Sequence, residues 1–504
     1  MNKHVALITP PSVFLCDERV FVHLGILKIA SVLEKTGFDI DVVDLSGVQN
    51  YAEVVSDYLS ASDCSVIGLT ATTPQMPAVE KLVEVIRAQR PDARIVLGGP
   101  HVTVTNVARK RELQKGIAGR AWKAFDRISR LADVLIAGDG EESVFIALTE
   151  NPPKLVDADD PASDLFLTPY RLNELPFPAR HLVDIHSYKY SIEGQPATSV
   201  VMQLGCPYEC GFCAGRLSPS YRRVRIRSIQ NVLSEVREIY ERYHFTGIQF
   251  YDDELNVSPR MAEDMRAISD LKKELGVDFK LRGFIKSNLS TEEQAAALRE
   301  AGFRQICVGF ESGSEKILKN INKKATRDQN SRCVEIAHRH GLKVKALMSV
   351  GHPGETAETV RETRDWLIEV KPDDFDCTVI TTYPGTPYYD EAVHSKDNVW
   401  VYTARNGDRL YAYDIDFVSC AQYYKGSLDA YASYVYTDFL KPDEIVKLRN
   451  WLETDVRRNL GLSFYQNAPS IRYDHSMGQL GNLPANILRS TNRPMNPISP
   501  PATS

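Results

Sequence analysis

The sequence has little of what a membrane, secreted or nucleic-acid-binding protein needs. No apolar run approaches the roughly 18 residues of a membrane-spanning helix, and the strand-length run that opens the chain ends at Pro10-Pro11 rather than in a signal-peptide pattern. The net charge of −6 leaves no basic footprint for nucleic acid. Nine cysteines in 504 residues are too few for a disulfide framework. We therefore expect a cytoplasmic protein with no membrane span and no nucleic-acid partner.

Three of the cysteines nevertheless cluster. Cys206, Cys210 and Cys213 form a C-x3-C-x2-C pattern directly after the apolar run Ser199 to Leu204. Three thiolates on one tight loop can hold three irons of a cubane cluster and leave the fourth iron free to chelate a small molecule. Zinc is the alternative, but a structural zinc site needs four ligands, usually in two spaced pairs. No second pair exists, because the other cysteines stand apart: Cys16, Cys64, Cys307, Cys333, Cys377 and Cys420.

The first 150 residues alternate between short apolar runs and runs with helical spacing. Expected strands are 5–8, 39–45, 66–70, 94–97 and 133–137. Such alternation predicts a doubly wound parallel sheet, with ligands outside the carboxyl ends of the strands. Glycine-containing loops follow these strands, where backbone amides can approach a phosphate or a flat ring closely. The loop residues of interest are Thr70, Thr72, Thr73, Gly98, Gly99, Pro100, His101, Gly138, Gly140 and Glu141.

The alternation resumes from about residue 196. Expected strands are 199–204, 247–251, 279–284, 305–310, 344–350 and 375–381, each followed by a polar turn and a helix. Six such βα units indicate parallel strands, and in parallel barrels the chemistry gathers at the carboxyl ends of the strands. The polar residues at those ends include Asp253 and Glu254, Glu311 and Ser312, and the G-H-P-G-E turn that begins at Gly351. Arg282, Lys286 and His352 lie near the same mouth and are interpreted as carboxylate clamps or surface groups.

These motifs resemble the radical S-adenosylmethionine (SAM) superfamily, whose C-x3-C-x-Φ-C signature is matched with Phe212 as the aromatic residue. The resemblance implies a [4Fe-4S] cluster on Cys206, Cys210 and Cys213. It also implies SAM binding by a larger set, in which carboxylates contact the amino group and ribose and the turn at Gly351 contacts the adenine. That set is Phe212, Asp253, Glu254, Glu311, Ser312 and Gly351.

The N-terminal loops resemble the cobalamin-binding domain that precedes the radical SAM core in one branch of the superfamily, the class B methyltransferase-like branch. The matching features are the early Pro-Pro loop, Leu24-Gly25, the G-G-P-H turn and the G-D-G-E turn. This implies that the ten loop residues named above bind cobalamin. The D-x-H-x-x-G motif, whose histidine replaces the lower base of cobalt, is absent, so the lower face of the cobalt is expected to be open. The alternative is a domain that keeps the fold without the cofactor.

The predicted fold class is therefore α/β, with a Rossmann-like cobalamin domain, a partial barrel and a mostly helical cap. The expected ranges are 1–150 for the cobalamin-binding domain, 151–195 for a proline-rich linker, 196–395 for the radical SAM core, 396–465 for an aromatic-rich cap and 466–504 for a disordered tail. The cap aromatics fit equally well a surface for a flat or apolar substrate and simple domain packing.

The resemblance implies reductive cleavage of SAM, hydrogen abstraction from an unactivated carbon and cobalamin-dependent C-methylation of a small-molecule substrate, with electrons from a flavodoxin- or ferredoxin-like donor. Two other readings stay open. One is a cyclase or oxidative rearrangement enzyme without methyl transfer, and the other is a non-catalytic cobalamin or iron–sulfur sensor. Transfer RNA methylthiolation is disfavoured, because the N-terminal part has only Cys16 and Cys64 and the chain is acidic. The sequence does not identify the substrate or a catalytic acid or base.

Overall fold

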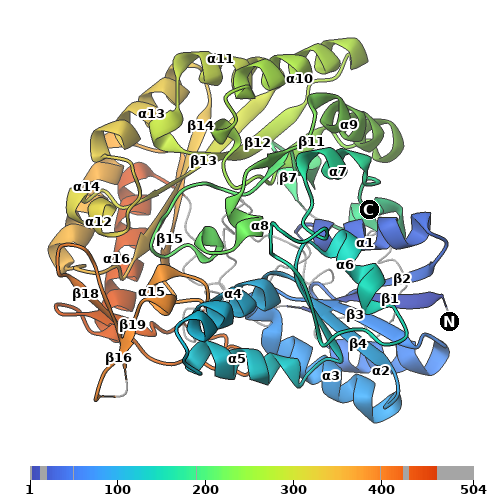
Figure 1. Ribbon diagram of the computed structural model, residues 1–504. Coiled ribbons are helices and arrows are strands. Elements are labelled where there is room, and N and C mark those ends of the chain that lie inside the picture. Colours follow the sequence, from blue (N-terminus) through green and yellow to red (C-terminus); the bar gives the residue numbers. More distant parts are fainter. Residues whose placement is uncertain are drawn as a thin grey trace.

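A computed structural model describes residues 3–11, 20–48, 50–188, 190–397, 399–423 and 431–462. Within these ranges the chain forms two α/β units and a C-terminal region that packs beside the second unit (Figure 1). The predicted tail, 466–504, lies outside the described residues. In the part of the chain that is described, no helix is both long and apolar enough to cross a membrane.

The N-terminal sheet is parallel throughout, with the order β2-β1-β3-β4-β5-β6. Strands β2 and β3 lie on opposite sides of β1, which creates a topological switch point at the carboxyl ends of β1 and β3, where ligands bind in open α/β sheets. The sixth strand comes from residues that the sequence analysis assigned to the linker. The strands are β1 (His4–Thr9), β2 (Asp39–Asp44), β3 (Val66–Thr70), β4 (Arg94–Gly98), β5 (Val134–Gly138) and β6 (Leu155–Ala158).

Helices cover both faces of this sheet, which confirms the doubly wound prediction. Along β1, Ala6 and Ile8 join the core beneath α2 and α3, whereas Val5 and Leu7 join the core beneath α1 and α6. This division follows from the twofold alternation of side chains along a strand. The helices are α1 (Leu24–Lys35), α2 (Tyr51–Ala61), α3 (Met76–Gln89), α4 (Pro100–Gln114), α5 (Arg120–Ser129) and α6 (Gly140–Ala147).

The second unit has a seven-stranded sheet, with the order β15-β14-β13-β12-β11-β8-β7. Six of its strands are parallel and form the predicted partial barrel, while β7 (Ser191–Ile192) runs antiparallel at one edge. The apolar run expected as the first strand divides instead into β8 and β9 (Gln203–Leu204), and β9 pairs with β10 (Arg225–Ile226). The parallel strands are β8 (Gln195–Val200), β11 (Gly247–Phe250), β12 (Lys280–Ile285), β13 (Phe303–Glu311), β14 (Lys343–Val350) and β15 (Asp374–Val379).

The helices of this unit lie outside the curved sheet (Figure 1). Local sequence signals fix where four of them begin, because the side chains of Ser228, Thr291, Thr326 and Thr356 each accept a hydrogen bond from the backbone of the first turn. The helices are α9 (Ile229–Tyr243), α10 (Met261–Leu275), α11 (Glu292–Ala301), α12 (Glu315–Asn320), α13 (Arg327–Arg339) and α14 (Ala357–Val370). Two short helices, α7 (Pro169–Glu174) and α8 (Pro219–Arg222), lie between the units.

The C-terminal region contains a long helix, α16 (Pro442–Leu460), which packs against α14 and β15. It also contains an antiparallel four-stranded sheet that the sequence analysis did not predict, preceded by the short helix α15 (Pro387–Asp390). The strands of this sheet are β16 (Val393–His394), β17 (Trp400–Thr403), β18 (Arg409–Ala412) and β19 (Val435–Thr437).

Candidate functional site

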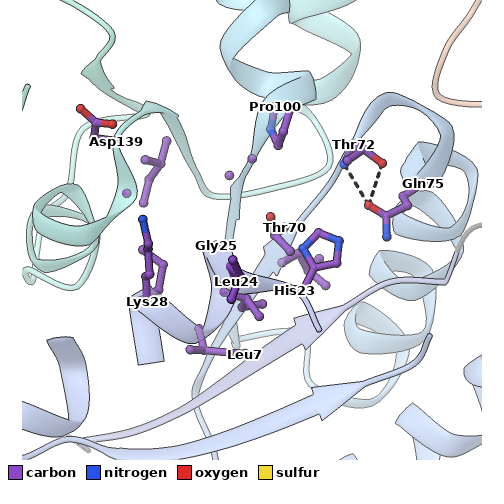
Figure 2. A pocket seen from close by; sticks show the side chains of 18 of the residues that line it. Leu7, His23, Leu24, Gly25, Lys28, Thr70, Thr72, Gln75, Pro100 and Asp139 are labelled. Carbon is purple, nitrogen blue, oxygen red and sulfur yellow. Dashed lines mark hydrogen bonds between the residues drawn. The ribbon is translucent and has the colours of Figure 1, made fainter. Parts of the chain in front are cut away.

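A cavity of about 860 Å³ lies at the carboxyl ends of the N-terminal strands (Figure 2), and residues of the second unit also line it. Nine of the ten loop residues predicted to bind cobalamin line it: Thr70, Thr72, Thr73, Gly98, Gly99, Pro100, Gly138, Gly140 and Glu141. The second unit and the segment after it contribute Ser199, Val201, Leu204, Ala214, Tyr221, Tyr251 and Tyr383. Ala214 directly follows Cys213, so the cavity extends to the cysteine loop.

At two positions in the cavity wall, the backbone conformation and the close packing require glycine. Gly99 has a φ of +98°, and a Cβ at this position would lie 2.7 Å from the backbone nitrogen of Ala71. Gly138 has a φ of +85°, and its Cβ would lie 2.5 Å from the carbonyl carbon of Ala158. An L side chain would therefore clash as well as strain the backbone at both sites. These glycines keep the two loops flat against neighbouring strands and leave the cavity open above them.

His101, the tenth predicted residue, does not line the cavity. Its Nδ1 lies 3.1 Å from Thr73 Oγ1, and its ring packs 6.1 Å from the ring of Phe417, centroid to centroid. Burial lowers the pKa of His101 to about 4, so the imidazole is neutral at physiological pH. The histidine thus fixes the loop that carries Thr73 rather than facing the cavity itself.

Gln75 is a loop residue that the sequence analysis missed. Its Oε1 accepts hydrogen bonds of 2.9 Å from both the backbone nitrogen and the hydroxyl of Thr72, as Figure 2 shows. Its Nε2 donates to the carbonyl of Pro10 at 2.6 Å. The side chain therefore ties the loop after β3 to the loop after β1. A glutamine three residues after a threonine is a capping-box signal that the sequence does contain.

The charged side chains of the wall come from the N-terminal unit. Lys28 Nζ lies 3.9 Å from Glu141 Oε1, and burial raises the pKa of Glu141. Asp139 forms a buried ion pair with Arg225, which belongs to β10 of the second unit. The wall contributed by the second unit is uncharged, so the two sides of the cavity differ in chemistry.

The cysteine loop is held by backbone contacts on both sides. Gly205 has a φ of +87° and packs so tightly that a Cβ would lie 2.2 Å from the carbonyl oxygen of Arg223. The backbone nitrogen of Cys206 donates to the carbonyl of Tyr221 at 2.8 Å, and that of Gly211 donates to the carbonyl of Ile321 at 2.8 Å. The loop is thereby fixed between β9, α8 and the end of α12.

Of the three thiols of the loop, Cys210 is buried and Cys206 half-buried, and loss of hydration raises the pKa values of all three. The pKa of Cys206 rises to about 11 and that of Cys213 to about 12, and that of Cys210 is also raised. Cys213 is solvent-accessible. Thiolates here need a compensating cation, which the irons of a cluster supply. Within the described ranges, no three His, Cys, Asp or Glu side chains converge on one metal-ion position. A cubane does not need such convergence, because its cysteines bind different irons.

The carboxylates after β11 have separate environments. Asp252 is 2% exposed and accepts hydrogen bonds from the backbone nitrogens of Met202 and Gln203, so it supports the strand before the cysteine loop. Burial raises the pKa of Asp253. Burial also raises the pKa of Glu254 to about 7, although the nearby Lys323 and Lys286 act to lower it. Asp253 and Glu254 remain the candidates to meet a ligand ammonium.

Glu311 is held in a strained conformation at the end of β13. Its φ is +67°, which is unusual for a residue with a side chain and marks a candidate functional position. One carboxylate oxygen lies 3.0 Å from Lys323 Nζ, and the other accepts a 2.8 Å hydrogen bond from Ser349 Oγ. Ser349 Oγ is also 2.8 Å from Nε2 of His352. The carboxylate is therefore oriented from two sides.

The other predicted SAM contacts are placed differently. Ser312 is buried, and its hydroxyl lies 3.0 Å from Thr363 Oγ1 of α14, so it supports the turn instead of facing a ligand. The backbone N–H of Gly351 donates to Glu355 at 3.2 Å. Phe212 packs against α12 and lies 5.5 Å from the ring of His352, centroid to centroid. The hydroxyl of Ser312 and the N–H of Gly351 thus serve the local fold, and the adenine contact expected of the turn at Gly351 stays a prediction.

Two buried lysines complete this mouth. Lys323 is 5% exposed; burial opposes its charge, but Glu311 and other anionic groups outweigh burial and raise its pKa. Lys286 is 2% exposed, donates to the carbonyl of Lys323 at 2.8 Å and lies 4.2 Å from the ring of Tyr208. Burial, helped by the neighbouring Lys323, lowers the pKa of Lys286. Lys286, Arg282 and His352 are all buried, so the surface interpretation is wrong for them.

Comparison with known proteins gives two family matches. Residues 200–367 match the Radical SAM superfamily, and residues 13–129 match the B12 binding domain. Among relatives, an uncharacterized methyltransferase of Pyrococcus horikoshii is 27% identical over 373 residues, which span 73% of this chain and 78% of that protein. The anaerobic magnesium-protoporphyrin IX monomethyl ester cyclase of Rubrivivax gelatinosus is 24% identical, spanning 72% of this chain and 65% of the cyclase.

Solved structures share the fold. The radical S-adenosylmethionine methyltransferase TsrM from Kitasatospora setae, with cobalamin and a [4Fe-4S] cluster bound, aligns with a TM-score of 0.62 at 17% identity, covering 94% of this chain and 93% of TsrM. The cobalamin-dependent S-adenosylmethionine radical enzyme OxsB aligns with a TM-score of 0.52 at 18% identity, over 72% of this chain and 51% of OxsB.

Proposed function

The chain belongs to the radical SAM superfamily and carries a B12-binding domain, and from this premise we propose that it C-methylates an unactivated carbon of a small-molecule substrate. One observation carries the proposal. A single cavity is bounded by the B12-domain loops at Gly99 and Gly138 and by Ala214 and Tyr251, which adjoin the cysteine loop and the carboxylate run. A substrate in this space can be reached from both cofactor sites.

The residues present fit the cofactors. Cys206, Cys210 and Cys213 would hold the [4Fe-4S] cluster, and the cavity loops would hold cobalamin. When bound, the cluster supplies the electron that cleaves the SAM sulfonium, and cobalamin supplies a cobalt centre that carries a methyl group. The cluster needs an external one-electron donor, for which a flavodoxin- or ferredoxin-like protein is suitable.

The chain's own groups bind and orient SAM. Asp253 and Glu254 would face the ammonium, and Glu311, fixed by Lys323 and Ser349, would accept hydrogen bonds from the ribose hydroxyls. The Glu311–Lys323 pair is largely buried, and the lower dielectric there strengthens interactions of its carboxylate. Ser312, also a member of the set that the resemblance implied, has no part in this role, because its hydroxyl is engaged with Thr363.

A cyclase or oxidative rearrangement activity is the second candidate, favoured by the match to the Rubrivivax gelatinosus cyclase. Two products separate the candidates. Methylation releases S-adenosylhomocysteine from one SAM and 5′-deoxyadenosine from another, whereas rearrangement releases deoxyadenosine without methyl transfer.

The test is anaerobic reconstitution of the chain with iron, sulfide and hydroxocobalamin, followed by methyl-labelled SAM and a reductant. We expect deoxyadenosine and S-adenosylhomocysteine together. Formation of deoxyadenosine alone supports rearrangement. If neither product forms, both candidate functions are contradicted. The triple variant Cys206→Ala, Cys210→Ala, Cys213→Ala should lose both products, while Cys420→Ser, a half-buried cysteine remote in sequence, serves as the control.

A further inference from the structure

His23 lies in the cavity wall directly before α1. Figure 2 shows its imidazole among the lining side chains, in the part of the cavity that also holds Thr70. The side chain does not cap the helix and has no hydrogen bond to any residue of the described chain. A polar ring therefore lines the cavity without a side-chain hydrogen-bond partner among the described residues.

The surroundings of this ring disfavour its charged form. Burial lowers the pKa of His23, and the nearby carboxylate of Asp44 opposes that effect without overcoming it. A neutral imidazole has a nitrogen lone pair, which is the form that ligates metals. Metal-bound histidines commonly donate their other N–H to a carboxylate, and Asp44 is the neighbouring group of that type. Asp44 is itself oriented by the backbone nitrogen of Ser46, at 3.0 Å.

No other side chain of the described cavity wall offers a free nitrogen lone pair. Lys28 is paired with Glu141, and the amide of Gln75 is engaged with Pro10 and Thr72. His101 is outside the wall and contacts Thr73. The Thr72 hydroxyl is likewise bound to Gln75.

We propose that His23 provides an axial nitrogen ligand to the cobalt of cobalamin bound in this cavity. The assignment differs from the expectation of an open lower face, which rested on the missing D-x-H-x-x-G motif. Here the histidine stands in an H-x-G arrangement with Gly25 and reaches the cavity from the helix start. The inference rests on cobalamin occupying the cavity, and it does not depend on which reaction follows.

The test uses the full chain loaded with hydroxocobalamin and reduced to cob(II)alamin, observed by electron paramagnetic resonance. An axial ¹⁴N ligand splits each cobalt line into a triplet, and protein grown with ¹⁵N-histidine should convert the triplet to a doublet. The nitrogen of cobalamin's own base is unlabelled, so its splitting of the cobalt lines stays a triplet. Labelling therefore shows whether the axial nitrogen comes from histidine or from that base. This measurement needs no variant and no turnover.

Variants then locate the ligand. His23→Gln should abolish the histidine splitting and weaken cobalamin binding by roughly tenfold or more, whereas His101→Gln, in the same domain but outside the cavity wall, should keep the splitting. A triplet that labelling leaves unchanged, or the absence of nitrogen splitting, overturns the assignment of His23 and leaves the proposed methyl transfer untouched. Failure to bind corrinoid overturns both the assignment of His23 and the proposed methyl transfer.

Discussion

Asp159 Oδ1 lies 2.6 Å from Ser218 Oγ and 2.8 Å from the backbone nitrogen of Ser220. Asp159 follows β6 of the N-terminal sheet, and the two serines belong to the segment that follows the cysteine loop. The carboxylate is 1% exposed, so these bonds connect the two units through the interior. A buried contact of this kind fixes the distance between the B12 domain and the cluster loop.

Removing this contact should destabilise the protein. We expect Asp159→Ala to lower the free energy of unfolding by about 3 kcal/mol, because Ser218 and Ser220 lose their acceptor inside the protein. Ser218→Ala removes one bond of the two and should cost less. Thermal unfolding measures both, with the exposed neighbour Asp160 as the matched control. Equal effects of Asp159→Ala and Asp160→Ala would show that the contact is not important for stability.

Lys323 is the buried cation of the SAM mouth, and its loss should affect both stability and SAM binding. In Lys323→Met the carboxylate of Glu311 loses its partner at 3.0 Å, and breaking a buried pair from one side typically costs about 3 kcal/mol. With Glu311 unpaired and with Glu254 losing the lysine that lowers its pKa, SAM affinity measured by calorimetry should fall roughly tenfold.

The adjacent Lys324 provides the control for this prediction, since its side chain is exposed. Lys324→Met should change the free energy of unfolding by less than about 0.5 kcal/mol and leave SAM affinity unchanged. Lys323→Arg keeps the charge and should retain part of the affinity. Undiminished SAM binding by Lys323→Met would remove Lys323 from the site.

Much of the fold could be predicted because its signals are local. Strand-length apolar runs alternate with helical spacing, and residues such as Ser228 and Thr326 stand where helix caps are required. Glycines such as Gly99 carry the positive φ that a tight turn needs. The cluster loop is also local, because its three cysteines lie within one short stretch. These features depend on neighbours along the chain, which the sequence displays directly.

The remaining features depend on neighbours across space. Lys323 reads as a surface lysine in the run Lys323-Lys324, and only the fold buries one of the two. Ser312 follows Glu311 directly, yet packing against Thr363 turns its hydroxyl away. The C-terminal sheet has strands of four residues or fewer, too short for a clear alternation. The roles assigned to Cys206, Asp253 and the cavity loops stay predictions until ligands are measured.

Glu355 should make stability depend on pH. It is 2% exposed, and burial raises its pKa from 4.5 to about 7. Between these values the folded protein retains a proton that the unfolded chain has released, so this group makes stability fall as pH rises. Glu355→Gln removes the titration. Relative to wild type, the variant should gain up to about 3 kcal/mol between about pH 5 and about pH 8.

Unfolding curves of both proteins across this range measure the difference. The exposed Glu358 in α14 is the control, because Glu358→Gln removes a carboxylate that is not buried. A constant offset between wild type and Glu355→Gln at every pH would contradict the raised pKa. A gain toward low pH would reverse the expected sign and contradict it as well.

A substitution at Gly25 should affect cobalamin binding without destabilising the fold. It lies in the first turn of α1 and lines the cavity, and no atom lies within 4 Å of the position where a Cβ would stand. Its backbone tolerates a side chain, so Gly25→Ala should leave the cobalamin-free protein as stable as wild type or up to about 1 kcal/mol more stable. If cobalamin packs directly on this turn, the added methyl group occupies its space and should weaken binding roughly tenfold, a cost of about 1.4 kcal/mol. Thermal unfolding without cobalamin and titration with hydroxocobalamin measure the two effects independently. Unchanged cobalamin affinity would place the cofactor away from the start of α1, and with it away from His23, because the two residues share this turn.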